Sequence, residues 1–347
     1  MYRGGYRPDY RNNSGGQKRK NDYNHDYDRS YKRPFGRSYD YHNRRRSPSS
    51  SGSSSSIDDE VGHYHGRVGS VIKNRYTIIK ELGKGTFGSV FKCKDSKHND
   101  HVALKIIRNI PRYIDSAKIE SDILDDVFEK QSSTGVDLCV NMYSRFRHED
   151  YFCMVFETLG VSLYDLVKKN NYKRFPLACV RDIARQLLQA LGFLQSINLI
   201  HTDLKLENVL FTHNTLKKVE VQQSGNTYTV EVPVNTSIKR KYSYTPTTAN
   251  IKPLIDFGGA TYGNDKSKSR IVNTRQYRGP EVTLELGWSF PSDMWSAGCI
   301  LAEVYSGDLL FQTHDELEHL AMMEHTLEYF PRHMADKSKH ALKFFNR

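Results

Sequence analysis

Hydrophobic and polar residues alternate through residues 76–94 with the two-residue period of half-buried β-strands. The alternating runs flank a glycine-rich stretch that starts at Gly83. A third run, residues 102–105, ends in a lysine, and residues 154–160 are an apolar run that leads into a connector. This part of the chain therefore predicts a small unit built mostly of β-strands.

The pattern changes to a helical period in several places. A helical stretch is predicted around Glu120, with its apolar side formed by Ile119, Ile123 and Leu124. Another helix, almost entirely apolar, opens at Asp293. A stripe at three- and four-residue spacing predicts a further core helix, and it consists of Val180, Ile183, Leu187, Leu191 and Leu194.

An insertion at residues 212–252 interrupts the second half of the chain. Residues 219–222 and 227–232 alternate around Ser224-Gly225-Asn226, which is the signal of a β-hairpin. The role of the insertion is not apparent from its residues.

The N-terminal segment differs from the rest in composition. Residues 1–57 contain thirteen Lys/Arg and five Asp/Glu, so they supply +8 of the net charge of +11. The segment has almost no aliphatic residues and is too polar to offset its conformational entropy by burial. We therefore predict a disordered tail over residues 1–67, with order beginning near Val68.

Basic clusters in this tail, at 18–20 and 44–48, are of the kind that directs nuclear import, so we expect a nuclear protein that can also occur in the cytoplasm. The alternative is a solvated tail that carries no localisation signal. Tyrosines alternating with arginines also suit weak contact with RNA, although a flexible tail is favoured over a dedicated RNA site.

The cysteines and the apolar runs exclude several classes of protein. The five cysteines are odd in number and form no CxxC pair, which favours reduced thiols in an intracellular protein over disulfides or a zinc site. The N-terminus is polar and shows no secretory signal, and no apolar run approaches the roughly 20 residues that span a bilayer. We expect a soluble chain that does not bind membranes.

Two short segments hold the candidate chemistry. The string HTDLKLEN occupies residues 201–208, and DFG follows at 256–258. Asp203 can orient a hydroxyl, Lys205 can meet a phosphate, and two oxygen ligands are available for Mg²⁺. Either string alone arises by chance, but their order behind a glycine-rich loop and a lysine-bearing strand indicates phosphoryl transfer.

The glycine-rich loop has the pattern GxGxxGxV from Gly83 to Val90. Its glycines let backbone N–H groups approach phosphate oxygens. The pattern also occurs in dinucleotide-binding folds, but there a helix follows, whereas here the chain continues as a strand. Lys105 ends the next strand, and Glu120 lies fifteen residues later, so we expect an ion pair that holds the lysine against the phosphates of ATP.

The chain resembles eukaryotic protein kinases over residues 76 to about 311, and more narrowly the LAMMER (CDC2-like) dual-specificity kinases. The narrower resemblance rests on the string EHLAMME at 318–324, on Thr202 where most kinases have arginine, and on TRQYR at 274–278. The EHLAMME string itself has the spacing of a buried helix face, at Leu317, Leu320 and Met322 or Met323.

The resemblance implies a two-lobed α+β fold, with a β-rich N-lobe at about 76–159 and a mainly helical C-lobe at about 160–347. It also implies that Asp203 accepts the proton of the attacking hydroxyl, that Lys205 neutralises the γ-phosphate, and that Asn208 and Asp256 hold Mg²⁺. The implied ATP-binding residues are Leu82, Gly83, Lys84, Gly85, Thr86, Phe87, Gly88, Val90, Ala103, Lys105, Phe156, Glu157, Leu159 and Leu210.

Some positions depart from the kinase pattern. Leu206 replaces a proline in the catalytic loop, and Gly279 replaces the alanine before Pro-Glu. The sequence stops where a kinase needs further C-lobe helices, so the arginine that usually pairs with Glu281 is absent. We therefore expect an incomplete C-lobe. Asp293 is expected to bond the backbone of the catalytic loop, which is a structural role.

The implied substrates are proteins, with Arg/Ser-rich splicing factors as the substrate class, phosphorylated on Ser/Thr and, by autophosphorylation, on Tyr; the chain is expected to act as a monomer. Two alternatives stay open. One is a kinase-shaped scaffold, or a truncated fragment, with impaired catalysis; the missing C-lobe favours it, and the intact Lys105, Asp203, Asn208 and Asp256 oppose it. The other is a related dual-specificity or cyclin-dependent-like kinase, which EHLAMME disfavours.

Overall fold

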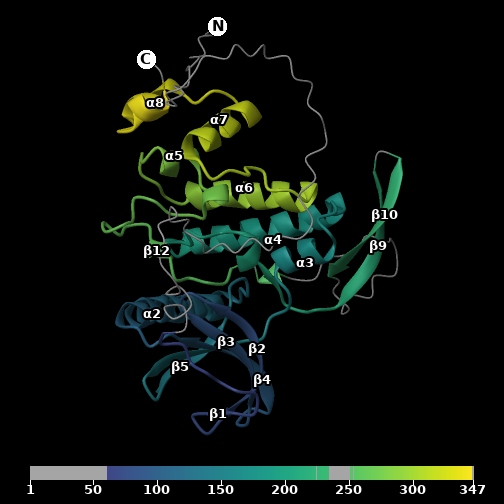
Figure 1. Cartoon of the computed structure of the whole chain (residues 1–347), viewed down its shortest axis with the longest axis vertical. Helices are drawn as coiled ribbons and strands as arrows, with labels where there is room; N and C mark the ends of the chain where they lie inside the picture. Colours follow the sequence, from purple (N-terminus) through teal and green to yellow (C-terminus); the bar gives the residue numbers. More distant parts are fainter. Residues whose placement is uncertain (1–60, 224, 234–250, 253, 346–347) are drawn as a thin grey trace, which may run out of the picture.

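The computed structural model describes residues 61–345 apart from 224, 234–250 and 253. This part of the chain forms a smaller lobe dominated by one β-sheet and a larger lobe dominated by helices (Figure 1). The predicted two-lobed α+β fold is confirmed.

The smaller lobe contains a six-stranded antiparallel sheet in the order β1-β2-β3-β4-β6-β5. Its strands are β1 (Val71–Ile72), β2 (Tyr76–Gly85), β3 (Gly88–Asp95), β4 (Asp100–Ile107), β5 (Met142–His148) and β6 (Tyr151–Phe156). One face packs into a core of its own, which includes Phe91, Leu104 and Ile106. Because side chains alternate along a strand, the opposite face carries half-buried residues of β3 and β4.

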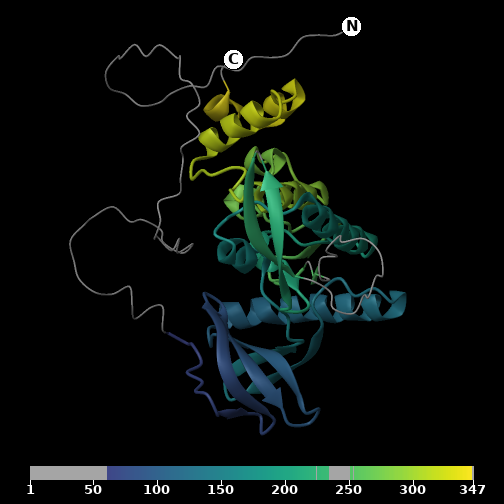
Figure 2. The ribbon, with the colours of Figure 1, turned by 90° about the vertical axis from the view of Figure 1, so that its right-hand side faces the viewer.

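Helix α2 (Pro111–Thr134) crosses the molecule between the sheet and the helical lobe (Figure 2). A proline in its first turn and a left-handed Gly135 (φ 69°) after its last turn set its ends. Its buried side includes Glu120, Ile123 and Leu124. Ile119 is 63% exposed, so its predicted place on the apolar side was wrong. At about 100° per residue, Ile119 points well away from the direction that Glu120 takes.

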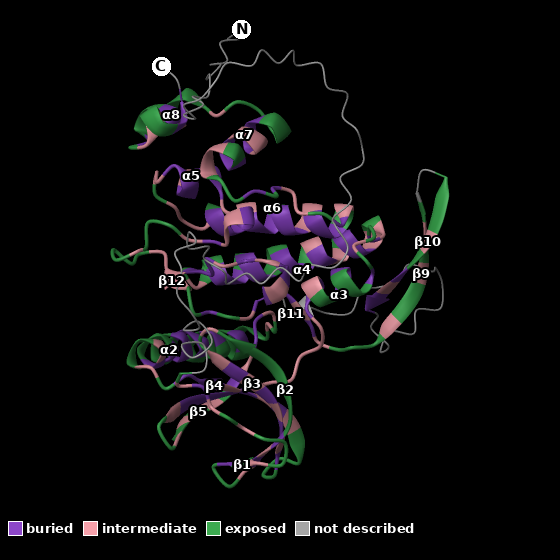
Figure 3. Ribbon diagram, in the orientation of Figure 1, coloured by how far each residue is buried: buried purple, intermediate pink, exposed green. Residues whose placement is uncertain are grey.

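The core of the larger lobe is formed by α4 (Leu177–Ser196) and α6 (Pro291–Ser306), which lie side by side (Figure 3). All five residues of the predicted stripe on α4 are buried. The other helices of this lobe are α3 (Leu163–Lys169), α5 (Pro280–Thr283), α7 (Glu316–Thr326), α8 (Arg332–Lys337) and α9 (Ala341–Phe344), with 3-10 turns η1 (Leu206–Asn208) and η2 (Arg275–Tyr277). No helix in the described residues is long and apolar enough to cross a membrane.

Helix α7 carries the EHLAMME string. Leu320 and Met323 are fully buried, and Leu317 and Met322 pack against the same core. The structural role predicted for this string is confirmed, because its apolar residues form the buried face of a helix.

The predicted hairpin is present in the insertion. Strands β9 (Leu216–Gln223) and β10 (Asn226–Pro233) pair antiparallel and project beside α3 (Figures 1 and 2). Asn170 fixes the hairpin to the end of α3, since its side chain donates to the Glu231 carbonyl (2.8 Å) and accepts from the Glu231 N–H (2.7 Å). Residues 234–250 of the insertion lie outside the described residues.

The smaller lobe begins earlier than predicted. Residues 1–60 of the predicted tail lie outside the described residues, but residues 61–67 lie against the sheet. His63 is 4% exposed, and the ring of Tyr64 packs edge-on against Tyr151 at 5.2 Å between centroids. The predicted boundary at residue 67 was therefore wrong, because aromatic packing extends the ordered domain to Val61.

Candidate active site

The half-buried face of the sheet carries the lysine of the predicted site. Val90 lies opposite Lys105 in the β3–β4 pair, and Ala103 lies two residues before that lysine on the same face. Ala103 is also paired with Phe156 of β6. The sheet thus places three residues of the predicted ATP site on one surface, directed toward the larger lobe.

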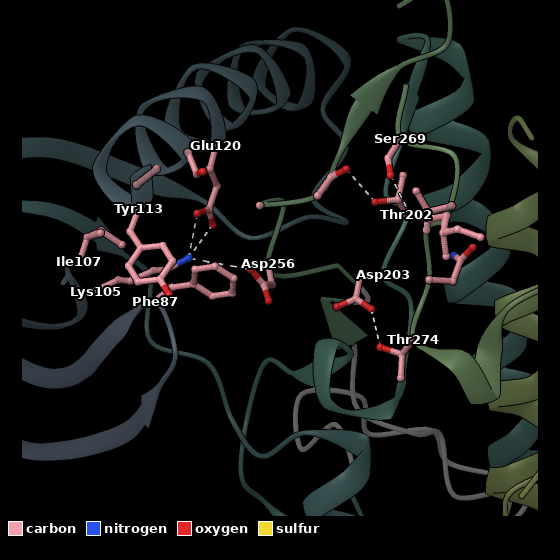
Figure 4. Close-up of a pocket in the computed structure, with 17 residues that line it drawn as sticks. Phe87, Lys105, Ile107, Tyr113, Glu120, Thr202, Asp203, Asp256, Ser269 and Thr274 are labelled. Atoms are coloured by element: carbon pink, nitrogen blue, oxygen red, sulfur yellow. Dashed lines mark hydrogen bonds and ion pairs between the residues drawn. The ribbon is translucent and has the colours of Figure 1, made fainter. Parts of the chain in front are cut away.

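Lys105 forms the predicted ion pair with Glu120. Its Nζ lies 2.7 Å from Glu120 Oε1 and 2.9 Å from Oε2, and 3.9 Å from Oδ1 of Asp256 (Figure 4). Burial disfavours the charged lysine, but the Glu120 and Asp256 carboxylates outweigh it and raise the pKa of Lys105. The ammonium group therefore stays charged, as a phosphate-binding group must.

The DFG segment is fixed by its phenylalanine. Phe257 is 1% exposed and packs edge-on against His201, with 5.1 Å between ring centroids. His201 Nε2 lies 2.9 Å from the carbonyl oxygen of Ile255. With Phe257 anchored and φ of Asp256 at 66°, the Asp256 carboxylate is 46% exposed and lines the cavity next to Lys105.

Asp293, at the start of α6, fixes the backbone of the catalytic loop at His201 and Thr202. Its carboxylate accepts hydrogen bonds from the backbone N–H groups of His201 (2.7 Å) and Thr202 (2.9 Å). Burial raises the pKa of Asp293, while these two donors favour its charged form. The predicted structural role of Asp293 is confirmed.

Asp203 lies at the centre of a hydrogen-bonded group. Its carboxylate is 2.5 Å from Lys205 Nζ and accepts a hydrogen bond of 2.7 Å from Thr274 Oγ1. Asn208 donates to the Asp203 carbonyl at 2.9 Å, which leaves the amide oxygen of Asn208 available to a cation. One carboxylate (Asp256) and one amide oxygen are a donor set that suits Mg²⁺ bound together with phosphates.

Lys105, Glu120, Asp203, Asp256 and Thr274 line a cavity of about 480 Å³, whereas Lys205 and Asn208 contact Asp203 but are not among the lining residues. The residues labelled in Figure 4 show the Lys105–Glu120–Asp256 group on one side and Asp203 with Thr274 on the other. Phe87 of the glycine-rich loop and Tyr113 of α2 also line this cavity. The cavity can therefore hold a phosphate chain beside an oriented hydroxyl group.

The structure brings Lys105, Glu120, Asp203 and Asp256 to one cavity, together with Phe87. The other predicted ATP-binding residues do not line this cavity, and their contacts with adenine stay a prediction. They are Leu82, Gly83, Lys84, Gly85, Thr86, Gly88, Val90, Ala103, Phe156, Glu157, Leu159 and Leu210.

Sequence reasoning missed two contributors to this site. Thr274 was considered only as part of the TRQYR string, yet its hydroxyl donates a hydrogen bond to the Asp203 carboxylate. Tyr113, in the first turn of α2, was not singled out. The TRQYR string could have pointed to Thr274, whereas no local signal marks Tyr113.

Glu281 has no basic partner within 4 Å among the described residues. It is half-buried, and burial raises the pKa of its carboxyl group. In the catalytic loop, Glu207 of η1 has one buried carboxyl oxygen without a hydrogen-bond partner, and burial raises the pKa of Glu207 as well.

Comparisons with known proteins agree with this geometry. Residues 76–346 match the family model described as protein kinase domain. Serine/threonine-protein kinase AFC3 of Arabidopsis thaliana is 43% identical over 291 residues, which cover 84% of this chain and 69% of that protein. Dual specificity protein kinase CLK2 of Homo sapiens is 42% identical over 289 residues, covering 83% and 54%.

A solved structure, the crystal structure of the kinase domain of PF14_0431, superimposes with a TM-score of 0.72 at 37% identity, covering 80% of this chain and 77% of that one. The chain belongs to the protein kinases, and within them to the LAMMER (CDC2-like) dual-specificity group. It spans 60% of the length of serine/threonine-protein kinase AFC1 of Arabidopsis thaliana and 54% of CLK2.

Proposed function

We propose that this chain transfers the γ-phosphoryl group of ATP to Ser and Thr hydroxyls of protein substrates, and to Tyr by autophosphorylation. The observation that carries the proposal is the Asp203 group, in which a carboxylate, a lysine and a threonine hydroxyl meet within hydrogen-bond distance. Asp203 and Thr274 line the same cavity as the Lys105–Glu120 pair, so the groups for binding phosphate and for orienting a hydroxyl lie around one space.

The chain's own groups divide the work of the reaction. Lys105, held by Glu120, binds the phosphates on the sheet side. The Asp203 carboxylate orients the attacking hydroxyl and takes its proton, and Lys205 offsets the charge of the transferred group. Asn208 and Asp256 would hold Mg²⁺, which neutralises charge on the phosphates when bound.

Two substitutions test the reaction. Asp203→Asn keeps the shape but removes the proton acceptor, so we expect a loss of at least about 100-fold in kcat with little change in ATP binding. Asp256→Ala should remove nearly all transfer and also weaken binding of Mg·ATP. Asp336→Asn, at a 71% exposed carboxylate, is the matched control. Wild-type turnover in purified Asp203→Asn protein would contradict the role proposed for Asp203, and absence of turnover in the wild-type protein would support a scaffold.

For the substrate we propose serines flanked by arginine, as in Arg/Ser-rich splicing factors. The chain supports this substrate class through its membership of the family that includes these dual-specificity kinases. An arginine beside the attacked serine needs a carboxylate near Asp203, and Glu207 lies four residues on with an unpartnered buried oxygen. A peptide array in which flanking arginines become alanine measures the preference. Equal phosphorylation of both peptide sets would contradict it.

We also propose that the protein resides in the nucleus, acts as a monomer and makes at most weak contact with RNA through its tail. The basic clusters at 18–20 and 44–48 support import, since Lys/Arg-rich runs of this length are common import signals. Replacing both clusters with alanine in a fluorescently tagged full chain should move it to the cytoplasm. Unchanged nuclear fluorescence would show that these clusters do not direct the protein to the nucleus.

A further inference from the structure

The segment that precedes the sheet, residues 61–64, is attached to the end of β4. The Asn109 N–H donates to the Gly62 carbonyl at 2.7 Å. The guanidinium of Arg108 donates twice to the Val61 carbonyl, from Nε at 2.9 Å and Nη2 at 2.7 Å. Arg108 is 7% exposed, so these charge-assisted hydrogen bonds are shielded from water.

The same arginine also reaches the glycine-rich loop. Its backbone N–H donates to the Phe87 carbonyl at 2.9 Å, and its Nη1 donates to the Thr86 carbonyl at 3.2 Å. Thr86 and Phe87 form the turn between β2 and β3. One buried side chain therefore connects the N-terminal segment with the tip of the loop.

Phe87 carries this connection into the cavity. Its ring packs edge-on against Tyr113 at 5.3 Å between centroids, and the Arg108 guanidinium lies 5.6 Å from the Tyr113 ring centroid. Phe87 and Tyr113 both line the cavity, where Figure 4 shows their rings close to Lys105. The junction thus sits directly over the proposed phosphate site.

On its flanks the loop is paired with β3 through residues 83–85. Leu82, Gly83, Lys84 and Gly85 are exposed, and a Cβ added at Gly83 or Gly85 would meet nothing within 4 Å. A loop with so few packed neighbours opens at low cost. Beyond the pairing with β3, its tip is held by the bonds to Arg108 and the packing of Phe87.

We infer that residues 61–64 form a strap that, through Arg108, holds the glycine-rich loop closed over the phosphates of ATP. Arg108 is a positioning residue, since it is not among the residues that line the cavity. The inference rests on the proposed function, because it names ATP as the ligand under the loop. It makes the N-terminal segment part of the catalytic domain's ATP site.

The test perturbs the connection from both ends in the full-length chain. Arg108→Ala removes the bonds to Val61 and Thr86. Gly62→Ala acts from the strap, because at φ +76° its Cβ would lie 3.2 Å from the Asn109 carbonyl oxygen. Gly69→Ala is the matched control: it introduces the same backbone strain at φ +89°, but its Cβ meets nothing within 4 Å.

Steady-state kinetics on an Arg/Ser peptide and thermal unfolding are measured for each protein. We expect Arg108→Ala to raise KM for ATP about 5- to 10-fold and Gly62→Ala about 3-fold, with KM for the peptide unchanged. Arg108→Lys should fall between wild type and Arg108→Ala, because lysine lacks the fork that reaches two carbonyls. Gly69→Ala should lower Tm without changing KM for ATP.

Two results would overturn the strap. One is an unchanged KM for ATP in both Arg108→Ala and Gly62→Ala proteins that still unfold cooperatively. The other is an equal rise in the Gly69→Ala control, which would make the effect one of general stability. If wild type itself transfers no phosphate, the proposed function fails instead, and binding of a fluorescent ATP analogue to the same variants still decides the strap.

Discussion

Gly88 shows how strictly single residues fix the phosphate-binding loop. It has φ +158°, and a Cβ at this position would lie 2.2 Å from the backbone carbonyl oxygen of Ile106 on the neighbouring strand. Only glycine allows β3 and β4 to approach this closely where the loop re-enters the sheet. The glycine pattern of the sequence therefore includes a packing requirement as well as a phosphate-binding one.

Replacing Gly88 with alanine should destabilise the fold by about 2–4 kcal/mol, because backbone rather than a flexible side chain must move. The matched change Gly83→Ala meets nothing within 4 Å and should cost less than about 1 kcal/mol. Urea unfolding of both variants measures the difference. Equal midpoints for the two would show that the strands at Gly88 can separate without cost.

Glu207 is the residue to which we assign the proposed preference for arginine-flanked serines. If its buried, unpartnered oxygen receives a substrate arginine, Glu207→Gln should lower kcat/KM for arginine-flanked serines about 10-fold and leave alanine-flanked peptides unchanged. Because burial raises the pKa of Glu207, the preference should weaken as the pH falls toward that raised pKa, where the carboxyl is neutral. A preference that is the same in both proteins would exclude Glu207.

At the scale of elements, an ion pair between the ends of two strands stabilises the smaller lobe. Arg75, just before β2, makes a bidentate pair with Asp95 at the end of β3, with both N–O distances 2.7 Å. The hydrogen bonds from Arg75 are the main cause that lowers the pKa of Asp95 to about 2. This pair closes the β2–β3 ribbon opposite the glycine-rich loop.

The pair predicts a dependence of stability on pH. The pKa of Asp95 is about 2 in the folded protein and about 3.9 when unfolded, so the carboxylate contributes on the order of 2 kcal/mol above pH 4. That contribution is lost as the pH falls from about 4 to 2. Asp95→Asn should reduce the free energy of unfolding at neutral pH and flatten its fall through this range, while Asp336→Asn should not. Parallel curves for wild type and Asp95→Asn would contradict this account.

The strands and helices that the sequence predicted correctly are those whose own period or motif defines them. The α4 stripe, the β9–β10 hairpin and the two catalytic strings depend on neighbouring residues, so one segment suffices to recognise them. Contacts between distant segments could not be predicted in this way. Thr274 with Asp203 and Arg108 with Val61 join residues 71 and 47 positions apart, and no local pattern encodes them.

At the scale of the whole molecule, the two lobes are joined through α2 and the catalytic loop. Glu120 of α2 pairs with Lys105 of the sheet, and Tyr262 of β12 (Thr261–Tyr262) donates a hydrogen bond to Asp126 further along the same helix. Thr202 donates to the Gly259 carbonyl at 2.7 Å, and its own carbonyl accepts from Asn273 at 2.9 Å. These contacts tie the segment after DFG to the catalytic loop and to α2.

Thr202 contacts the segment after DFG through hydrogen bonds and brings no positive charge to it. Most kinases have an arginine at this position, whose charge opposes the active loop until a phosphate neutralises it, and threonine has no such charge. The central claim is therefore a kinase whose catalytic site is assembled before any modification of residues 256–281. We expect that modification of Thr261, Tyr262, Ser267, Ser269 or Thr274 would only tune activity.

The most direct test is phosphotransfer by the unmodified protein. The full-length chain is treated with phosphatase, shown by mass spectrometry to carry no phosphate at residues 256–281, and mixed with labelled ATP and an Arg/Ser peptide. Transfer is followed within a single turnover, before rephosphorylation can occur. The account predicts immediate transfer at the rate of the untreated protein. No transfer, or a lag that ends only when this segment becomes phosphorylated, would contradict it.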